Sequence, residues 1–171
     1  MKQDILHLKS GKQTLHLTES IEVLGLWIGQ NDDKVDMQLD VQLDQPDLTC
    51  QIFLKIILFD SARISLKSNF AIGSQAKSTD SFLKVSALTC SPDCKIEVTP
   101  GMEIKTNYLK AGHGLSVSYL DPEQLFYLQS KGLNSAESEK LLIAAFAQEI
   151  IDRATPANKP TLLSEYAKFE K

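Results

Sequence analysis

Apolar and polar residues alternate along most of the first 120 positions of the chain. The alternation is clearest at residues 5–11, 13–20, 35–44 and 62–73. A period of two predicts β-strands with one buried face. Residues 51–59, QIFLKIILF, are almost continuously apolar, which predicts a strand that is buried on both faces.

The segments between these runs are short and polar. Tight hairpins favour Asn-Gly or Asp-Gly pairs, and the sequence contains neither. Many short strands without such pairs fit a sandwich, a barrel, or a solenoid that turns corners without reversing direction. The sequence shows no strict internal repeat. Periodicity alone therefore leaves these three architectures open.

The pattern becomes helical after Leu120. Asp121 can cap a first helix, with Gln124 completing a capping box, and Gly132 suits the end of that helix. A second helix is expected over residues 135–153, where apolar residues recur at helical spacing. A last short helix would carry an apolar side formed by Leu162, Tyr166 and Phe169. These patterns predict a β core at residues 1–120 and a C-terminal helical subdomain at residues 121–171.

Composition narrows the classes of protein to which the chain can belong. A length of 171 residues suits one domain with its own core. The net charge of −4 argues against a nucleic-acid partner, and no apolar run approaches the length needed to cross a bilayer. The N-terminus shows no apolar signal-peptide region, and the cysteine count is odd and low. A cytoplasmic protein with reduced thiols is therefore expected.

Motifs for catalysis are weak, so the chain is not expected to be an enzyme. The stretch SGKQT resembles the end of a phosphate-binding loop, but Leu6 and Gln13 stand where the motif needs glycine and a hydroxyl residue. Cys90 and Cys94 are spaced as C-x3-C, and with His113 they could bind zinc or iron. The alternative is that the two cysteines pack near a corner of the fold.

The segment at residues 110–133, KAGHGLSVSYLDPEQLFYLQSKGL, resembles the C-terminal signature of the SufB/SufD family, the paired scaffold subunits of SUF iron–sulfur cluster assembly. In that family a K-C-S-H-G-like strand leads into L-D-E-E-Q-L-F-Y-L-R-S-R-G. The following helix, SAESEKLLIAAFAQEII, is also similar. The order and spacing of the similar segments hold from about residue 24 to about residue 153.

This resemblance implies a right-handed parallel β-helix followed by a helical subdomain. It implies a non-catalytic SufD-like scaffold whose partners are a SufC-type ABC ATPase and a SufB-like scaffold or a second copy of the chain. His113 matches an interface histidine implicated in cluster assembly, so any iron or iron–sulfur cluster would be bound transiently, and no cofactor tightly. The residues expected to bind the ATPase are Asp121, Glu123, Gln124, Leu125, Phe126, Tyr127, Leu128 and Gly132.

Several positions depart from the family pattern. Ala111 replaces the cysteine two positions before the histidine, and Val85 lies near the position of the SufB cysteine thought to receive sulfur. Gly114 follows the histidine where SufB has glutamate, so the resemblance is to SufD. The missing cysteines favour an alternative, in which the chain is a homodimeric β-helix module that has lost cluster chemistry.

Overall fold

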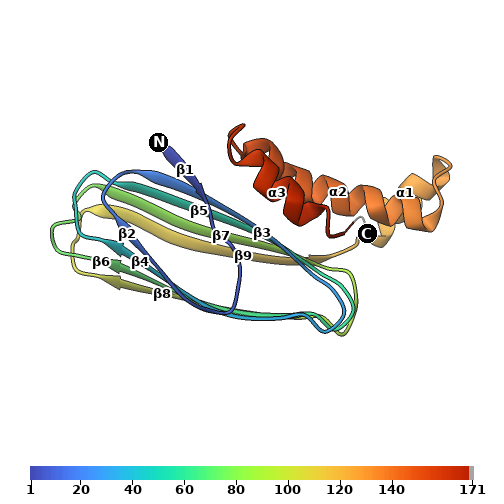
Figure 1. Cartoon of the computed structure of the whole chain (residues 1–171), viewed down its shortest axis with the longest axis horizontal. Helices are drawn as coiled ribbons and strands as arrows, with labels where there is room; N and C mark the ends of the chain where they lie inside the picture. The colour runs from blue at the N-terminus through green and yellow to red at the C-terminus, as the bar shows by residue number, and fades with distance from the viewer. Residues whose placement is uncertain (170–171) are drawn as a thin grey trace.

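The computed structural model describes residues 1–169, and in this range β-strands are followed by α-helices (Figure 1). The strands are β1 (Lys2–Ile5), β2 (Gly11–Leu17), β3 (Ile21–Gly29), β4 (Lys34–Leu43), β5 (Thr49–Leu58), β6 (Arg63–Ile72), β7 (Thr79–Thr89), β8 (Lys95–Ile104) and β9 (Leu109–Tyr119). The helices are α1 (Pro122–Ser130), α2 (Ser135–Arg153) and α3 (Lys159–Tyr166). The last two residues of the expected helical subdomain lie outside the described range.

The strands form two parallel sheets. Sheet A contains β1-β3-β5-β7-β9, and sheet B contains β2-β4-β6-β8. Each strand pairs with the strand two places later, so that Ile21 aligns with Cys50, Cys50 with Ser81, and Ser81 with Ala111. This connectivity is a parallel β-solenoid, which confirms the predicted β-helix and rules out a sandwich or barrel built of antiparallel hairpins.

The interior between the two sheets holds the main hydrophobic core. Alternate residues of each strand point into it, as shown by Leu39, Val41 and Leu43 of β4, which have no measurable exposure. Cys50 belongs to this core. Because the strands are stacked in register, apolar side chains at paired positions form columns along the solenoid.

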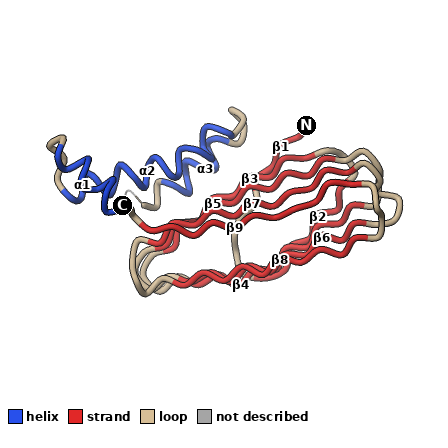
Figure 2. The backbone as a smooth tube through the Cα atoms, turned by 180° about the vertical axis from the view of Figure 1, so that it is seen from behind, coloured by secondary structure: helices blue, strands red, loops and turns tan. Residues whose placement is uncertain are grey.

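A second apolar layer lies on the outer face of sheet A. Helix α2 packs Ile143, Ala147, Ile150 and Ile151 onto this face, and α3 adds Leu162. Figure 2 shows both helices along the sheet A side of the solenoid. The layer explains the continuous apolar run in β5, where Ile56 faces the interior and Ile57 faces the helices. Leu162, Tyr166 and Phe169 do share one apolar cluster, as predicted.

Polar residues in left-handed backbone conformations turn the corners. Asn31 and Asp60 have φ values of 54° and 52°. The amide of Asn31 donates to the carboxylate of Asp60 at 2.8 Å, and the amide of Asp60 donates to Ser91 Oγ at 3.0 Å. Short polar side chains tolerate this conformation and bond locally. The corners therefore stack between successive turns without hairpin dipeptides.

The N-terminal end of the solenoid is closed by the segment at residues 6–10. The alternation at residues 5–11 predicts a strand, but the strand β1 ends at Ile5, and after the bond from the Leu6 amide to the Leu24 carbonyl at 2.8 Å the segment is not strand. Instead Leu6 and Leu8 insert into the interior core, with exposures of 4% and 6%. Gly25 makes room for them, because a Cβ atom there would meet a methyl of Leu8 at 2.7 Å. The strand prediction for this segment is therefore wrong, although its apolar residues are buried.

Candidate interaction site at the open end of the solenoid

The C-terminal end of the solenoid, formed by β8 and β9, is not covered by any part of residues 1–169. Both strands lie at the edge of their sheets. Paired positions in a parallel ladder point to the same face, so Leu115 and Val117 of β9 continue the interior columns of Val85 and Ala87. They are 48% and 50% exposed, whereas their partners in β7 are buried. The site is thus an apolar core layer without its next turn, and we call it the open end.

His113 lies in the middle of this layer. It aligns with Leu83, which faces the interior, so its imidazole is on the interior side of β9. The flanking glycines have a packing role on the other side of the strand. A Cβ at Gly112 would meet the ring of Phe82 at 3.1 Å, and one at Gly114 would lie 3.6 Å from it. The ring of Phe82 therefore lies against the glycines on the outer side of the strand. On the interior side, the neighbours of His113 along β9 are the apolar residues Ala111 and Leu115.

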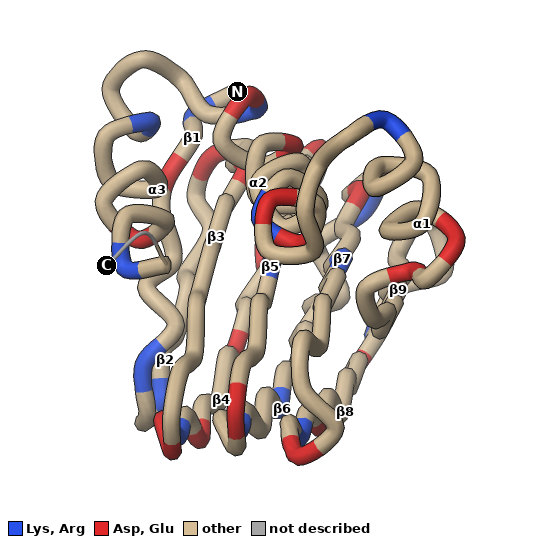
Figure 3. The backbone as a smooth tube through the Cα atoms, turned by 90° about the vertical axis from the view of Figure 1, so that its right-hand side faces the viewer, with Lys and Arg blue, Asp and Glu red and all other residues tan. Residues whose placement is uncertain are grey.

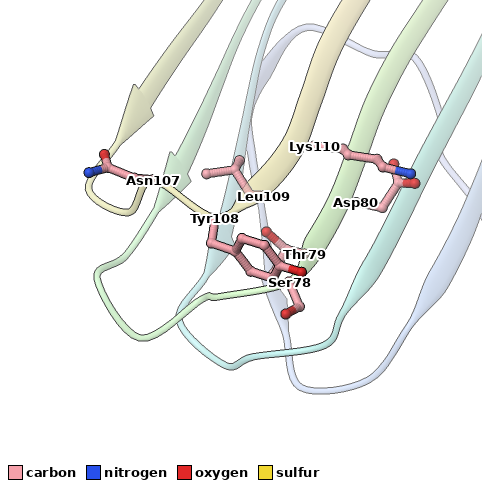
Figure 4. A pocket seen from close by; sticks show the side chains of 7 residues that line it. All are labelled: Ser78, Thr79, Asp80, Asn107, Tyr108, Leu109 and Lys110. Carbon is pink, nitrogen blue, oxygen red and sulfur yellow. The ribbon is translucent and has the colours of Figure 1, made fainter.

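A cavity of about 430 Å³ lies at the corner beside the open end (Figure 4). Its lining contains Ser78, Thr79, Asp80, Asn107, Tyr108, Leu109 and Lys110. The amide of Ser78 donates to the carbonyl of Tyr108 at 2.7 Å, and the Tyr108 ring, which is 73% exposed, lies over Ser78 and Thr79. This corner belongs to the same uncovered last turn as His113.

The C-x3-C pair does not join His113 in a metal site. Cys94 packs against the interior core and lies 3.6 Å from the carbonyl of Asp60, whereas Cys90 packs in the cluster under the helices. Burial raises the pKa of the Cys90 thiol to about 12, which disfavours the thiolate that binds metals. Within residues 1–169 no three His, Cys, Asp or Glu side chains are grouped to hold a metal ion. The packing alternative for these cysteines is supported.

Helix α1 carries the predicted partner-binding residues in an exposed position. None of its described residues is buried, and Phe126 and Tyr127 are 73% and 60% exposed. Asp121 caps the helix by accepting the amide of Glu123 at 2.9 Å, and Gly132 ends the turn with a φ of 102°. Gln124, expected to complete a capping box, makes no such bond in the described helix.

The remaining predicted residues follow the same pattern. Glu123 and Gln124 are exposed, whereas Leu125 and Leu128 are half-buried. The α1–α2 hairpin projects past the end of sheet A (Figures 1 and 2). It therefore presents an aromatic surface that the solenoid does not cover. Whether this surface binds a partner stays a prediction.

Two polar contacts between α2 and sheet A are not predicted by the sequence. Lys55, which is 7% exposed, donates to Glu149 at 2.6 Å, and Arg153 donates to Glu22 at 2.6 Å. The hydrogen bond from Lys55 lowers the pKa of Glu149. The signal in the sequence was a lysine inside the apolar run QIFLKIILF, but nothing local indicates a partner 94 positions away.

Comparisons with known proteins agree with the observed fold. Residues 13–146 match the family described as SUF system FeS cluster assembly, SufBD core domain. A SufBD family iron–sulfur cluster assembly protein of Mycobacterium tuberculosis is 28% identical over 156 residues, which cover 86% of this chain and 39% of the relative. The protein SufD of Escherichia coli is 30% identical over 98 residues, which cover 57% of this chain and 23% of SufD.

A SufBD family protein of Synechocystis is 28% identical over 153 residues, which cover 86% of this chain and 34% of the relative. The chain thus spans less than half the length of these curated relatives. In residues 1–169 no helix is long and apolar enough to cross a membrane. The match over most of the chain, together with the parallel solenoid and its C-terminal helices, shows that the chain belongs to the SufBD core domain family of the SUF iron–sulfur cluster assembly system.

Proposed function

We propose that the chain is a SufD-like, non-catalytic scaffold subunit that pairs with another β-solenoid through its open end and docks a SufC-type ATPase through its C-terminal helices. The observation that carries the pairing is the difference between the two ends of the solenoid. Leu6 and Leu8 plug the N-terminal end, whereas Leu115 and Val117 are left half-exposed at the other. An apolar surface that continues the core but is left exposed by the described residues is typical of a protein–protein interface.

Strand β9 is the better edge for this pairing. It offers an unpaired backbone edge from Leu109 to Tyr119 without a proline. Strand β8 carries Pro100, which lacks an N–H donor, and prolines at edges hinder strand addition. A partner strand added to β9 would also cover Leu115 and Val117. The partner is a SufB-like scaffold or a second copy of the chain.

His113 gives this interface its proposed chemical role. A neutral imidazole can ligate iron or relay a proton near neutral pH. His113 would face the partner from the interior side of β9, where its neighbours on the strand are apolar. The iron or nascent cluster is cargo of the assembly, and the remaining ligands would come from the partner, because Ala111 supplies none.

The second surface is the α1–α2 hairpin. Phe126 and Tyr127 are exposed on α1, and Leu141 on α2 is 47% exposed. Aromatic side chains are the residues most enriched at the centres of protein interfaces. Because this hairpin and the open end are different surfaces, a scaffold could bind the ATPase and a second solenoid together.

The pairing is tested by measuring molar mass in solution with and without a SufB-type scaffold. Leu115→Lys with Val117→Lys should abolish association, because two ammonium groups would have to be buried. Leu163→Lys, an equally exposed apolar site on α3, is the control and should leave association unchanged. A parent chain that is monomeric alone and fails to bind the scaffold contradicts the proposal.

The docking of the ATPase is tested separately by a pull-down with a SufC-type ATPase. Phe126→Ala with Tyr127→Ala should reduce binding at least about tenfold, as expected for loss of a central aromatic pair. The same variant should still pair with the scaffold. If the parent chain does not bind the ATPase, the helices serve only to cover the solenoid.

The alternative function is a homodimeric module without cluster chemistry, which the replacement of a cysteine by Ala111 favours. It predicts a dimer of the chain alone that takes up no iron or labile sulfide in anaerobic reconstitution. The scaffold proposal instead predicts that the complex with a SufB-type partner holds iron, and that His113→Ala lowers the amount.

A further inference from the structure

Helix α2 is attached to sheet A by two reciprocal ion pairs. In the first, Lys55 of the sheet binds Glu149 of the helix, with Nζ 2.6 Å from Oε2. In the second, Arg153 of the helix binds Glu22 of the sheet, with Nε 2.6 Å from Oε1. The sheet and the helix thus each supply one cation and one anion. If Glu149 and Arg153 changed places on the helix, Lys55 would face Arg153, and Glu22 would face Glu149.

Both cations also contact an aromatic ring. Lys55 Nζ lies 3.9 Å from the centre of the Phe146 ring, and the Arg153 guanidinium lies 3.7 Å from the centre of the Phe53 ring. Phe146, Glu149 and Arg153 occur at helical spacing on the side of α2 that faces the sheet. The two pairs therefore fix the helix at two points along its axis.

The apolar contacts of α2 do not fix its position in this way. Ile143, Ala147 and Ile150 pack on aliphatic side chains of the sheet, and such contacts are not directional. A slide by one turn, about 5 Å, would bring Ala147 and Ile151 to the places of Ile143 and Ala147, so part of the apolar area would stay buried. The apolar contacts therefore favour the observed position only in part, and directional contacts complete the selection, among them the ion pairs and the bond from Gln3 to the Arg153 carbonyl at 3.1 Å.

Lys55 supplies the selection because its charge is almost completely buried. Its side chain is 8% exposed, whereas that of Glu149 is 65% exposed. A buried ammonium without a counter-charge is strongly unfavourable, so Lys55 accepts only helix positions that bring a carboxylate to it. Lys84 also lies near Glu149 and adds positive charge at the same place.

The neighbouring positions of α2 do not provide a substitute. A shift by four positions would bring Arg153 or the uncharged Ala145 toward Lys55, and a shift by three would bring Asp152 but would take Arg153 away from Glu22. Asp152 is already bound to Gln148 at 2.6 Å and to Lys159 at 3.4 Å. Only the observed register pairs Lys55 with a carboxylate and Arg153 with Glu22.

We infer that the Lys55–Glu149 and Arg153–Glu22 pairs are a register lock, which sets where α2 sits along sheet A and hence where the α1–α2 hairpin projects from the solenoid. A single buried polar pair can specify register even where an apolar pair would be as stable. The inference stands whether or not the hairpin binds an ATPase.

The test measures the distance between spin labels on the full chain. The labels are placed at Gln129→Cys on α1 and Thr99→Cys on the outer side of β8, both exposed, with Cys90 and Cys94 replaced by serine. The parent should give one narrow distance distribution. Lys55→Met with Glu149→Leu should remain folded but give a second population, displaced by about one helical turn, or about 5 Å.

The control variant is Lys67→Met with Glu139→Leu, which removes an exposed lysine and an exposed glutamate outside the lock. It should keep the single distribution. An unchanged distribution in the Lys55 and Glu149 variant overturns the inference. If that variant does not fold, Glu22→Gln with Arg153→Met tests the Arg153–Glu22 pair, and a second distance population is again expected. If neither variant folds, the ion pairs stabilise the helix rather than position it, and the inference is overturned.

Discussion

His113 stands directly beside Leu83 in the parallel ladder of sheet A, at the last strand of the column. Its imidazole therefore occupies a position that the previous turn fills with a buried aliphatic side chain. A polar ring is not required there for packing, because the position is exposed in the chain.

His113→Leu should change the free energy of unfolding by no more than about 0.5 kcal/mol, as is usual for exposed positions. Urea unfolding measures this. If His113 serves cluster assembly, the same variant should lose iron in the complex with a SufB-type partner. A large loss of stability would instead make His113 a structural residue.

Gly25 is required for the plug at the N-terminal end. Its substitution by alanine would bring a Cβ to 2.7 Å from methyls of both Leu8 and Leu54 and to 3.1 Å from the carbonyl of Leu6. Gly25→Ala should lower the free energy of unfolding by about 1–3 kcal/mol, the usual cost of overpacking. Hydrogen exchange should rise first at residues 6–10. Gly114→Ala, whose Cβ would have a normal 3.6 Å contact, is the matched control.

Stability should fall in acid partly through Glu149 and Asp40. Hydrogen bonds from Lys55 and Lys12 lower the pKa values of these carboxyls below their ordinary values of 4.5 and 3.8. A lowered pKa means that the unfolded chain takes up the proton first. The stabilising contribution is therefore complete above about pH 5 and is lost as the pH falls through the lowered values.

Glu149→Gln should destabilise the protein at pH 7 by about 1–3 kcal/mol, because the buried Lys55 loses its carboxylate. Its unfolding free energy should also depend less on pH between 5 and 3 than that of the parent. Denaturant titrations at several pH values measure both effects. Equal pH dependence in the two proteins would contradict the assignment.

The three cysteines should differ in reactivity. Burial raises the pKa values of Cys50 and Cys90 to about 12, so neither forms much thiolate at neutral pH. Cys94 is half-buried at a corner and should be alkylated first at pH 8. Peptide mass spectrometry before and after denaturation locates the modified thiols. Early modification of Cys90 would show that the helices expose it readily.

The sequence predicts the class of the fold better than its connections. Alternation locates β4 and β6 because each has one buried face, and the dense run in β5 correctly indicates burial on both faces. Alternation does not say which strand pairs with which, since a solenoid and a sandwich bury the same pattern. Residues 6–10 show the same limit, because Leu6 and Leu8 alternate inward although neither lies in a strand.

The helical part and the site were predictable to different degrees. Asn134 and Glu137 form a capping box at the start of α2, with the three-residue spacing that such boxes have in sequence. Neighbours on a helix diverge by about 100°, so Phe126, Tyr127 and Leu128 cannot all face one core, but only the structure shows that Phe126 and Tyr127 are the exposed ones. Lys55 could not be paired with Glu149 from the sequence, because the contact depends on how the helix crosses the sheet. The open end likewise emerges only from the stacking of β8 and β9.

The packing of α2 and α3 on sheet A has a consequence for the order in which the protein unfolds. Figure 3, which views the solenoid end-on, shows α3 and α2 side by side on the sheet A side, and their apolar side chains form one cluster with residues of β3, β5 and β7. Gln3 near the N-terminus donates to the carbonyl of Arg153 at 3.1 Å. A solenoid without such helices could unfold from either end, one turn at a time. Helices α2 and α3, which together form a strap over sheet A and are bonded to the first strand, oppose this stepwise unfolding. Mechanical or chemical unravelling should therefore begin with detachment of the strap and then proceed as one cooperative event.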